Sequence, residues 1–220
     1  MATVDFHERQ LTLKLVYYGP PLSGKTSNLR WLYGRVDRAG RGRLMTLDTR
    51  DDRTLFFDLL PIFFRSSNFS FAIKVYTVPG QPMHEATRRV VLDRADGVVF
   101  VADSAPDQEG HNREAWAGLA RHLGALGLTR IPTILQYNKR DLVDAVPLDT
   151  PLWPSVAGAG APELPVFPAQ ATSGVGVVET FFALVERAWG PIEADLKLSS
   201  RFGIDAATFR AALAAHVGIG

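Results

Sequence analysis

One stretch of the chain has the residue types and the spacing that hold a run of phosphates. Residues 19–26 read Gly-Pro-Pro-Leu-Ser-Gly-Lys-Thr and match the pattern GxxxxGK(S/T) at every specified position. A tight loop of this kind points successive backbone N–H groups at phosphate oxygens, and a helix that starts at its end adds its positive dipole. In this pattern Lys25 reaches the β- and γ-phosphates, and the Thr26 hydroxyl is a ligand of Mg²⁺. The predicted nucleotide-binding residues of this stretch are Gly19, Pro20, Pro21, Leu22, Ser23, Gly24, Lys25, Thr26 and Ser27.

The residues around this loop provide the strand and the helix that the motif requires. Residues 9–18 alternate and then become continuously apolar, which predicts a strand that enters a covered sheet. Residues 24–36 place Leu29, Leu32 and Tyr33 at helical spacing. The alternative is a chance match in a glycine-bearing turn, and the flanking strand and helix argue against it.

A second motif, Asn-Lys-Arg-Asp at residues 138–141, follows another apolar run. It indicates which nucleotide base the site would bind. The carboxylate of Asp141 can accept hydrogen bonds from the N1–H and the 2-amino group of guanine, and adenine offers neither donor on that edge. Asn138 would brace the base and the phosphate loop, and the alkyl stem of Lys139 would lie over the purine plane. By themselves these residues could form an ordinary charged turn, but together with the phosphate loop they predict a site for GTP and GDP. Further along the chain, the backbone N–H of Ala171 is a candidate donor to guanine O6.

Apolar runs that read as strands alternate with amphipathic segments that read as helices. This alternation predicts an α/β fold, a P-loop NTPase G domain with an open, mostly parallel sheet and helices on both faces. Ligands of such sheets bind outside the carboxyl ends of the strands, so the phosphate loop, Gly80 with Gln81, and residues 138–141 should surround one site. Further strands are expected at 69–78, 96–103, 131–137 and 166–167, and further helices at 87–94, 108–127, 175–196 and 205–217.

The length and composition fit one compact domain. The chain has 220 residues, of which 46% are hydrophobic and 21% are charged, which gives a sizeable core but no room for an independent second domain. We expect the domain at residues 1–198, with a proline- and glycine-rich surface excursion near 144–165, and a C-terminal helical extension at 199–220. The pattern of the last helix leaves open whether it docks on its own domain or on a partner.

Composition also excludes several classes of function. A net charge of +1 gives no electrostatic reason to expect nucleic acid or an anionic membrane surface as a partner. The absence of cysteine removes disulfides, thiolate metal sites and thiol nucleophiles. The first residues lack the apolar core of a signal peptide, and no apolar run reaches transmembrane length. We therefore expect a cytoplasmic protein with no direct membrane anchor.

The motifs, in this order, resemble those of Ras-type small GTPases. More narrowly, residues 16–29, 52–61 and 76–81 resemble the MglA family of bacterial polarity and gliding-motility GTPases, and the resemblance covers about residues 9–195. It implies a molecular switch that binds GTP or GDP with Mg²⁺, hydrolyses GTP slowly by itself, and passes between an effector-binding state and an inactive state. It also implies a roadblock-type, MglB-like activator and effectors of polarity or motility as partners.

The resemblance assigns roles in two switch segments, residues 48–60 and 79–88. Gln81 would orient the attacking water, and Arg53 resembles an arginine finger, supplied within the chain, that stabilises the charge of the transition state. Thr54 would be a second Mg²⁺ ligand, closing over the γ-phosphate. Arg53 could equally be a solvated surface residue beside its acidic neighbours.

Two residues depart from the pattern of Ras-like GTPases. Thr77 stands where most of them have the magnesium-side aspartate of DxxG, and Pro21 brings a ring and no N–H into the phosphate loop. These departures leave an alternative open, a GTP-binding scaffold with little or no intrinsic hydrolysis. A P-loop kinase or ATPase with a coincidental Asn-Lys-Arg-Asp is a further alternative. The phenylalanines and leucines of residues 56–64 could form a partner surface, but most of them are expected in the core.

Overall fold

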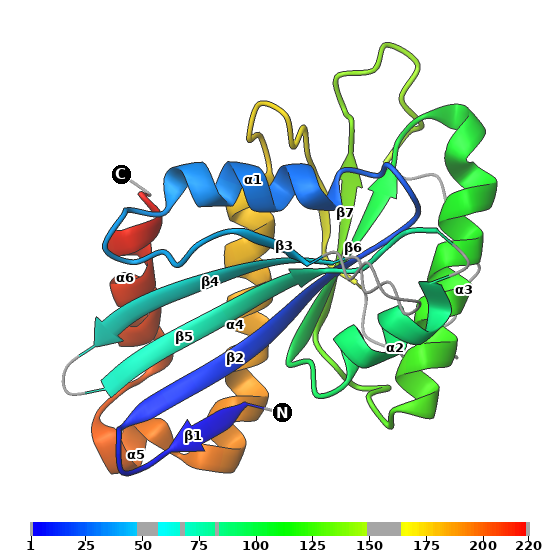
Figure 1. Cartoon of the computed structure of the whole chain (residues 1–220). Coiled ribbons are helices and arrows are strands. Elements are labelled where there is room, and N and C mark those ends of the chain that lie inside the picture. Colours follow the sequence, from blue (N-terminus) through cyan, green and yellow to red (C-terminus); the bar gives the residue numbers. More distant parts are fainter. Residues whose placement is uncertain (1, 48–56, 67–68, 82–83, 149–163, 219–220) are drawn as a thin grey trace.

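The fold is a single mixed sheet with helices on both of its faces (Figure 1). The structure is a computed structural model that describes residues 2–47, 57–66, 69–81, 84–148 and 164–218. In this part of the chain the sheet is 8-stranded with the order β3-β4-β5-β2-β6-β7-β8, and β1 pairs with β2 outside that path. The strands are β1 (Thr3–Asp5), β2 (Gln10–Tyr18), β3 (Met45–Leu47), β4 (Phe57–Ser66), β5 (Phe69–Thr77), β6 (Gly97–Asp103), β7 (Thr133–Asn138) and β8 (Val166–Pro168).

The centre of the sheet is parallel, and its antiparallel pairs involve β1, β3 and β4. Strand β2 pairs in parallel with β5 and β6, and β6 continues in parallel to β7 and β7 to β8. Strand β4 pairs antiparallel with β5 and with β3. The predicted open, mostly parallel α/β sheet is therefore confirmed.

Alternation along β2 divides the core into two layers. Leu13, Leu15 and Tyr17 face one layer, whereas Val16 and Tyr18 face the other. The first layer is covered by α1, α4 and α6, and the second by α2 and α3. The helices are α1 (Lys25–Arg35), α2 (Glu85–Leu92), the short 3₁₀ helix η2 (Pro106–Gln108), α3 (Glu109–Ala125), α4 (Val177–Leu196), α5 (Leu198–Phe202) and α6 (Ala206–Val217).

Strand β4 is the element that the sequence pattern describes least well, since residues 48–61 read only as a charged loop joined to an apolar stretch. Its side chains alternate, with Leu60, Ile62 and Phe64 buried and Phe63 exposed. The expectation that most large side chains of this segment lie in the core therefore holds for one face of the strand only. Phe56 lies outside the described residues.

The C-terminal helix α6 docks on its own domain. Asp205 caps the helix by accepting a hydrogen bond from the Thr208 N–H, as an N-cap residue does. Phe209 is 1% exposed and stacks on Trp189 of α4 with a centroid distance of 4.3 Å. His216 Nδ1 lies 2.8 Å from the Asp37 carboxylate, which ties the end of α6 to the loop after α1. None of the described helices is both long enough and apolar enough to cross a membrane.

Candidate nucleotide-binding site

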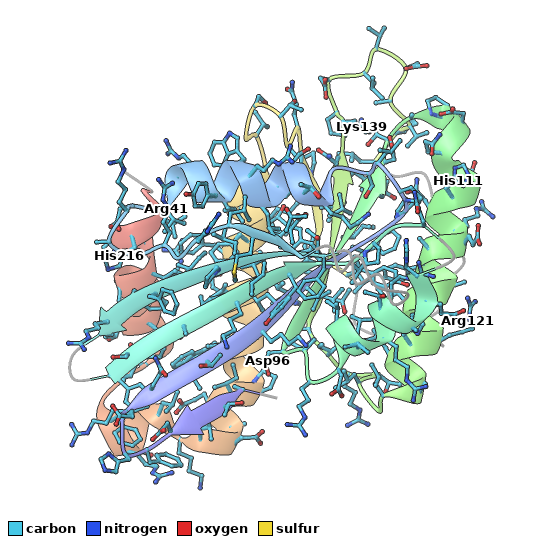
Figure 2. All side chains as sticks on the ribbon, viewed as in Figure 1. Arg41, Asp96, His111, Arg121, Lys139 and His216 are labelled. Carbon is cyan, nitrogen blue, oxygen red and sulfur yellow. The ribbon has the colours of Figure 1, made fainter. Side chains whose placement is uncertain are left out.

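The parallel strands bring the two sequence motifs to one edge of the sheet. The phosphate loop follows β2 and residues 138–141 follow β7, and the carboxyl ends of parallel strands lie at the same edge. Figure 2 shows Lys139 and His111 near this edge and Asp96 toward the opposite end of the sheet. Loops after β5, β6 and β8 reach the same edge and complete the site.

Close approach of neighbouring chain segments accounts for both glycines of the phosphate loop. Gly19 has φ +148, and a Cβ there would lie 2.3 Å from the Val101 carbonyl oxygen. Gly24 has φ +100, and a Cβ there would lie 2.0 Å from Asn138 Nδ2. Leu22 is also left-handed, with φ 59, and its side chain is 88% exposed. The alternating backbone conformation is of the kind that turns successive N–H groups toward one anion.

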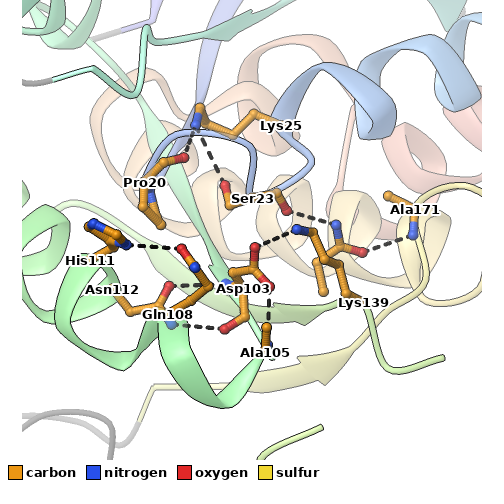
Figure 3. Close-up of polar contacts among 11 residues, drawn as sticks. Pro20, Ser23, Lys25, Asp103, Ala105, Gln108, His111, Asn112, Lys139 and Ala171 are labelled. Carbon is orange, nitrogen blue, oxygen red and sulfur yellow. Dashed lines mark hydrogen bonds and ion pairs between the residues drawn. The ribbon is translucent and has the colours of Figure 1, made fainter. Parts of the chain in front are cut away.

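Lys25 opens helix α1 and folds back over the loop, as Figure 3 shows. Its ammonium donates to the carbonyl oxygens of Gly19, at 2.9 Å, and Pro20, at 2.5 Å. The pKa of Lys25 is lowered to about 7, mainly by burial and also by the Arg88 cation, while the Asp58 carboxylate opposes the shift. A phosphate against the ammonium would restore the charged form, because a nearby opposite charge favours it.

Asn138 joins the phosphate loop to the loop after β8. Its Nδ2 donates to the Ser23 carbonyl at 2.8 Å, and its Oδ1 accepts from the Ala171 N–H, also at 2.8 Å. Both side-chain ends are therefore used to set the distance between the two loops. The Ala171 N–H, predicted as a donor to guanine O6, is occupied by Asn138 in this conformation.

Lys139 is held by a partner that the sequence did not reveal. Its ammonium lies 2.5 Å from Oδ2 of Asp103, a 2%-exposed carboxylate at the end of β6 (Figure 3). Asp103 is itself fixed by Asn112, which exchanges hydrogen bonds with the Asp103 backbone N–H and carbonyl. The ion pair fixes the end of the lysine side chain and so limits the course of its alkyl stem. Asp141 is exposed two residues further on.

Gln81 is exposed, and the turn that carries it lies against the phosphate loop. A Cβ on Gly80 would lie 2.4 Å from the Pro21 nitrogen, so only glycine fits at this point. Arg88 of α2 donates to the Gln81 carbonyl at 2.6 Å and to the Pro79 carbonyl at 3.4 Å. Beside this turn lies a cavity of about 190 Å³, lined by parts of the phosphate loop, Gly80, Arg88 and α3. Sequence reasoning missed Arg88 because the groups of this turn that it contacts are backbone carbonyls, which carry no residue-type signal.

The Thr26 hydroxyl, predicted to bind Mg²⁺, meets a carboxylate from β4. It donates to Asp58 Oδ2 at 2.6 Å, and the Thr77 hydroxyl donates to the same oxygen at 3.0 Å. Hydroxyl and carboxylate oxygens are the hard donors that Mg²⁺ takes, usually with only one or two carboxylates from the protein. The donor set therefore fits this ion. Asp58 was not among the predicted site residues.

Two predicted site residues, Arg53 and Thr54, lie outside the described residues. The others meet at the carboxyl edge: the phosphate loop, Gly80 with Gln81, and Asn138 with Lys139 and Ala171. Asp58, Arg88 and Asp103 join them there from β4, α2 and β6.

A mixed, mostly parallel sheet with GxxxxGK(S/T) after β2 and Asn-Lys-Arg-Asp after β7 defines the G domain of a P-loop GTPase. The chain is 39% identical over 189 residues to the mutual gliding-motility protein MglA of Myxococcus xanthus (strain DK1622), a match that covers 84% of this chain and 95% of that protein. The chain therefore belongs to the MglA family of small GTPases, as its motifs predicted. No protein-family model matches it. Family membership decides against a P-loop kinase or ATPase.

Proposed function

We propose that this chain is a molecular switch that binds GTP and GDP with Mg²⁺ and hydrolyses GTP. The observation that carries the proposal is the Asn138 bridge, with 2.8 Å contacts to Ser23 and to Ala171. The ribose joins the phosphates of a guanine nucleotide to its base and limits the distance between them, so a site that binds both ends needs its two loops held at a suitable spacing. The bridge provides this spacing.

In the proposed complex each part of the nucleotide meets a different element. The phosphate-loop N–H groups and Lys25 hold the phosphates, and Asp141 pairs with the guanine edge. Thr26, with Thr54, would hold Mg²⁺, which when bound neutralises charge on the phosphate oxygens. The stem of Lys139, fixed by Asp103, covers the purine.

Hydrolysis then depends on groups that place water and stabilise charge. Gln81 is proposed to orient the attacking water, with its backbone held by Arg88. Arg53 is proposed as the arginine finger, ordered over the γ-phosphate when an activator binds. Such a finger is worth roughly 10³–10⁵ in rate.

The proposed setting follows from the family. The M. xanthus relative is named for gliding motility, and we propose that this chain also serves polarity or motility in the cytoplasm. Its proposed partners are a roadblock-type, MglB-like activator and effectors that bind one nucleotide state.

A scaffold that holds GTP with little hydrolysis is the second candidate, and the contact of Gly80 with Pro21 favours it. The proline ring lies at the turn that carries Gln81, where the attacking water would have to fit. This crowding would slow the chemical step without affecting the base site.

Single-turnover GTP hydrolysis tests both candidates. Wild type, Pro21→Gly and Arg53→Ala are compared, alone and with a roadblock-type protein. The switch predicts slow turnover that accelerates with the partner in wild type and not in Arg53→Ala. Turnover that is seen only in Pro21→Gly would instead support the scaffold.

A further inference from the structure

Asp58 is a buried carboxylate at the magnesium side of the site. It is the second residue of β4 and is 7% exposed. Its Oδ2 accepts from the hydroxyls of Thr26 and Thr77, and its Oδ1 accepts from the Thr46 hydroxyl at 2.8 Å. Its backbone N–H donates to Thr77 Oγ1 at 2.9 Å, which locks the pair together. Its hydrogen-bond partners within the described residues are these hydroxyls, and the Lys25 ammonium lies near enough for the carboxylate to raise its pKa. A buried carboxylate whose hydrogen-bond partners are neutral favours a further cation nearby.

We propose that Asp58 is the magnesium-side carboxylate of this GTPase, taking the role that Ras-like proteins give to the aspartate at the position of Thr77. The inference rests on the proposed binding of Mg²⁺ with the nucleotide. It assigns Asp58 as a positioning residue that acts through Thr26 and through metal-bound water.

Hydrogen bonding gives Asp58 two ways to act on the ion. A hydroxyl has one proton and two lone pairs, so a Thr26 hydroxyl that donates to Asp58 keeps its lone pairs for the metal. A carboxylate also has lone pairs left for water bound to Mg²⁺, an ion that keeps several waters. Partners of this kind orient metal ligands, and losing them typically costs about 10–100-fold in metal affinity.

The arrangement also explains why Thr77 is not an aspartate. Thr77 is 3% exposed and uses its hydroxyl both to accept from and to donate to Asp58. A second carboxylate at residue 77 would face Asp58 at hydrogen-bond distance, and two like charges that close disfavour each other's ionisation. Strands β4 and β5 are neighbours, so a carboxylate on β4 can lie beside Thr26 in the place that a carboxylate at residue 77 of β5 would otherwise take.

The test measures the rate at which a fluorescent GDP is released at increasing Mg²⁺ concentrations. Bound Mg²⁺ slows this release, and the Mg²⁺ concentration that gives half of the maximal slowing reports the Mg²⁺ affinity. Asp58→Asn should raise that concentration about tenfold or more, with each variant compared against its own release rate in excess EDTA. The double variant Asp58→Asn/Thr77→Asp restores a carboxylate from β5 and should return to within threefold of wild type. Asp96→Asn, a half-buried aspartate at the far end of the sheet that accepts a hydrogen bond from the Lys14 N–H, serves as the control and should behave as wild type.

Each outcome decides the proposal. An unchanged magnesium requirement in Asp58→Asn, or a double variant that is no better than the single one, overturns it. If Asp58→Asn does not fold, the double variant still decides, since it must bind Mg²⁺ as wild type does. A wild type whose GDP release ignores Mg²⁺ overturns the proposed cofactor as well, whereas a wild type that binds Mg²⁺ but does not hydrolyse GTP overturns only the proposed switch.

Discussion

Asn138→Ala removes the side chain that holds the phosphate loop against the base loops. The Ser23 carbonyl and the Ala171 N–H, each 2.8 Å from Asn138, would both lose their partner. A buried polar group left unsatisfied costs about 1–3 kcal/mol, so the two together cost about 2–6 kcal/mol. This is a large share of the roughly 5–15 kcal/mol by which a typical domain is stable.

The assay is urea unfolding of the nucleotide-free protein, followed by titration with a fluorescent GDP. Asn112→Ala is the matched control, since Asn112 is equally buried and also makes two backbone hydrogen bonds, both to Asp103. Both variants should lose a similar free energy of unfolding. Asn138→Ala should lose at least tenfold more GDP affinity than Asn112→Ala, because Asn138 sets the spacing of the two loops, whereas Asn112 acts on the site only through Asp103 and Lys139.

Two results would refute this reasoning. A loss of under 1 kcal/mol for Asn138→Ala would mean that its partners find other donors and acceptors. An equal GDP affinity in both variants would mean that the bridge stabilises the fold without organising the site.

Three further predictions concern the phosphate loop and the turn beside it. Gly80→Ala should place a methyl group against Pro21 and displace the turn that carries Gln81. Because a shift of about 1 Å can cost about 10²-fold in rate, the rate of single-turnover hydrolysis should fall while GDP affinity stays the same. An unchanged hydrolysis rate would contradict this prediction. Lys25 has a pKa of about 7 in the folded state and a higher pKa in the unfolded state, so above pH 7 the unfolded state binds more protons. The free energy of unfolding of the nucleotide-free protein should therefore rise as the pH rises above 7, by up to about 1.4 kcal/mol per pH unit. Lys25→Met should flatten that rise in urea unfolding at pH 7, 8 and 9, and parallel curves would show that Lys25 is not its source. Arg88→Gln should lower the hydrolysis rate about tenfold with unchanged GDP affinity. Arg88→Lys should recover part of that rate, because a lysine can still donate to the Gln81 carbonyl. An equal loss of rate in the two variants would mean that a guanidinium contact other than the one to Gln81 is responsible.

The sequence predicts those parts of the molecule whose physics is local. The phosphate loop has both of its glycines within eight residues, and the continuously apolar stretches at residues 15–18 of β2 and 98–102 of β6 can be recognised because burial on both faces leaves no exposed position there. The G-domain architecture follows from their alternation with helices. These predictions needed no knowledge of which strand lies beside which.

The parts that were missed depend on contacts between distant segments. Asp58 looks like one more acid in a charged stretch until β4 pairs antiparallel with β5 and brings it to Thr26, 32 residues away. Asp103 looks like the polar end of a buried strand until it meets Lys139, 36 residues further on. The docking of α6 was left open for the same reason, because Phe209 and Trp189 come together only through the packing of α6 on α4.

Base selection is the most direct test of the account, because the proposed site joins a phosphate loop to a guanine-specific edge. The measurement is displacement of a fluorescent GDP from the wild-type protein by unlabelled GDP and, separately, by ADP. The account predicts displacement by GDP at concentrations at least a thousandfold below those needed for ADP, about 4 kcal/mol of discrimination, and loss of this preference in Asp141→Ala. Equal displacement by the two nucleotides would contradict it.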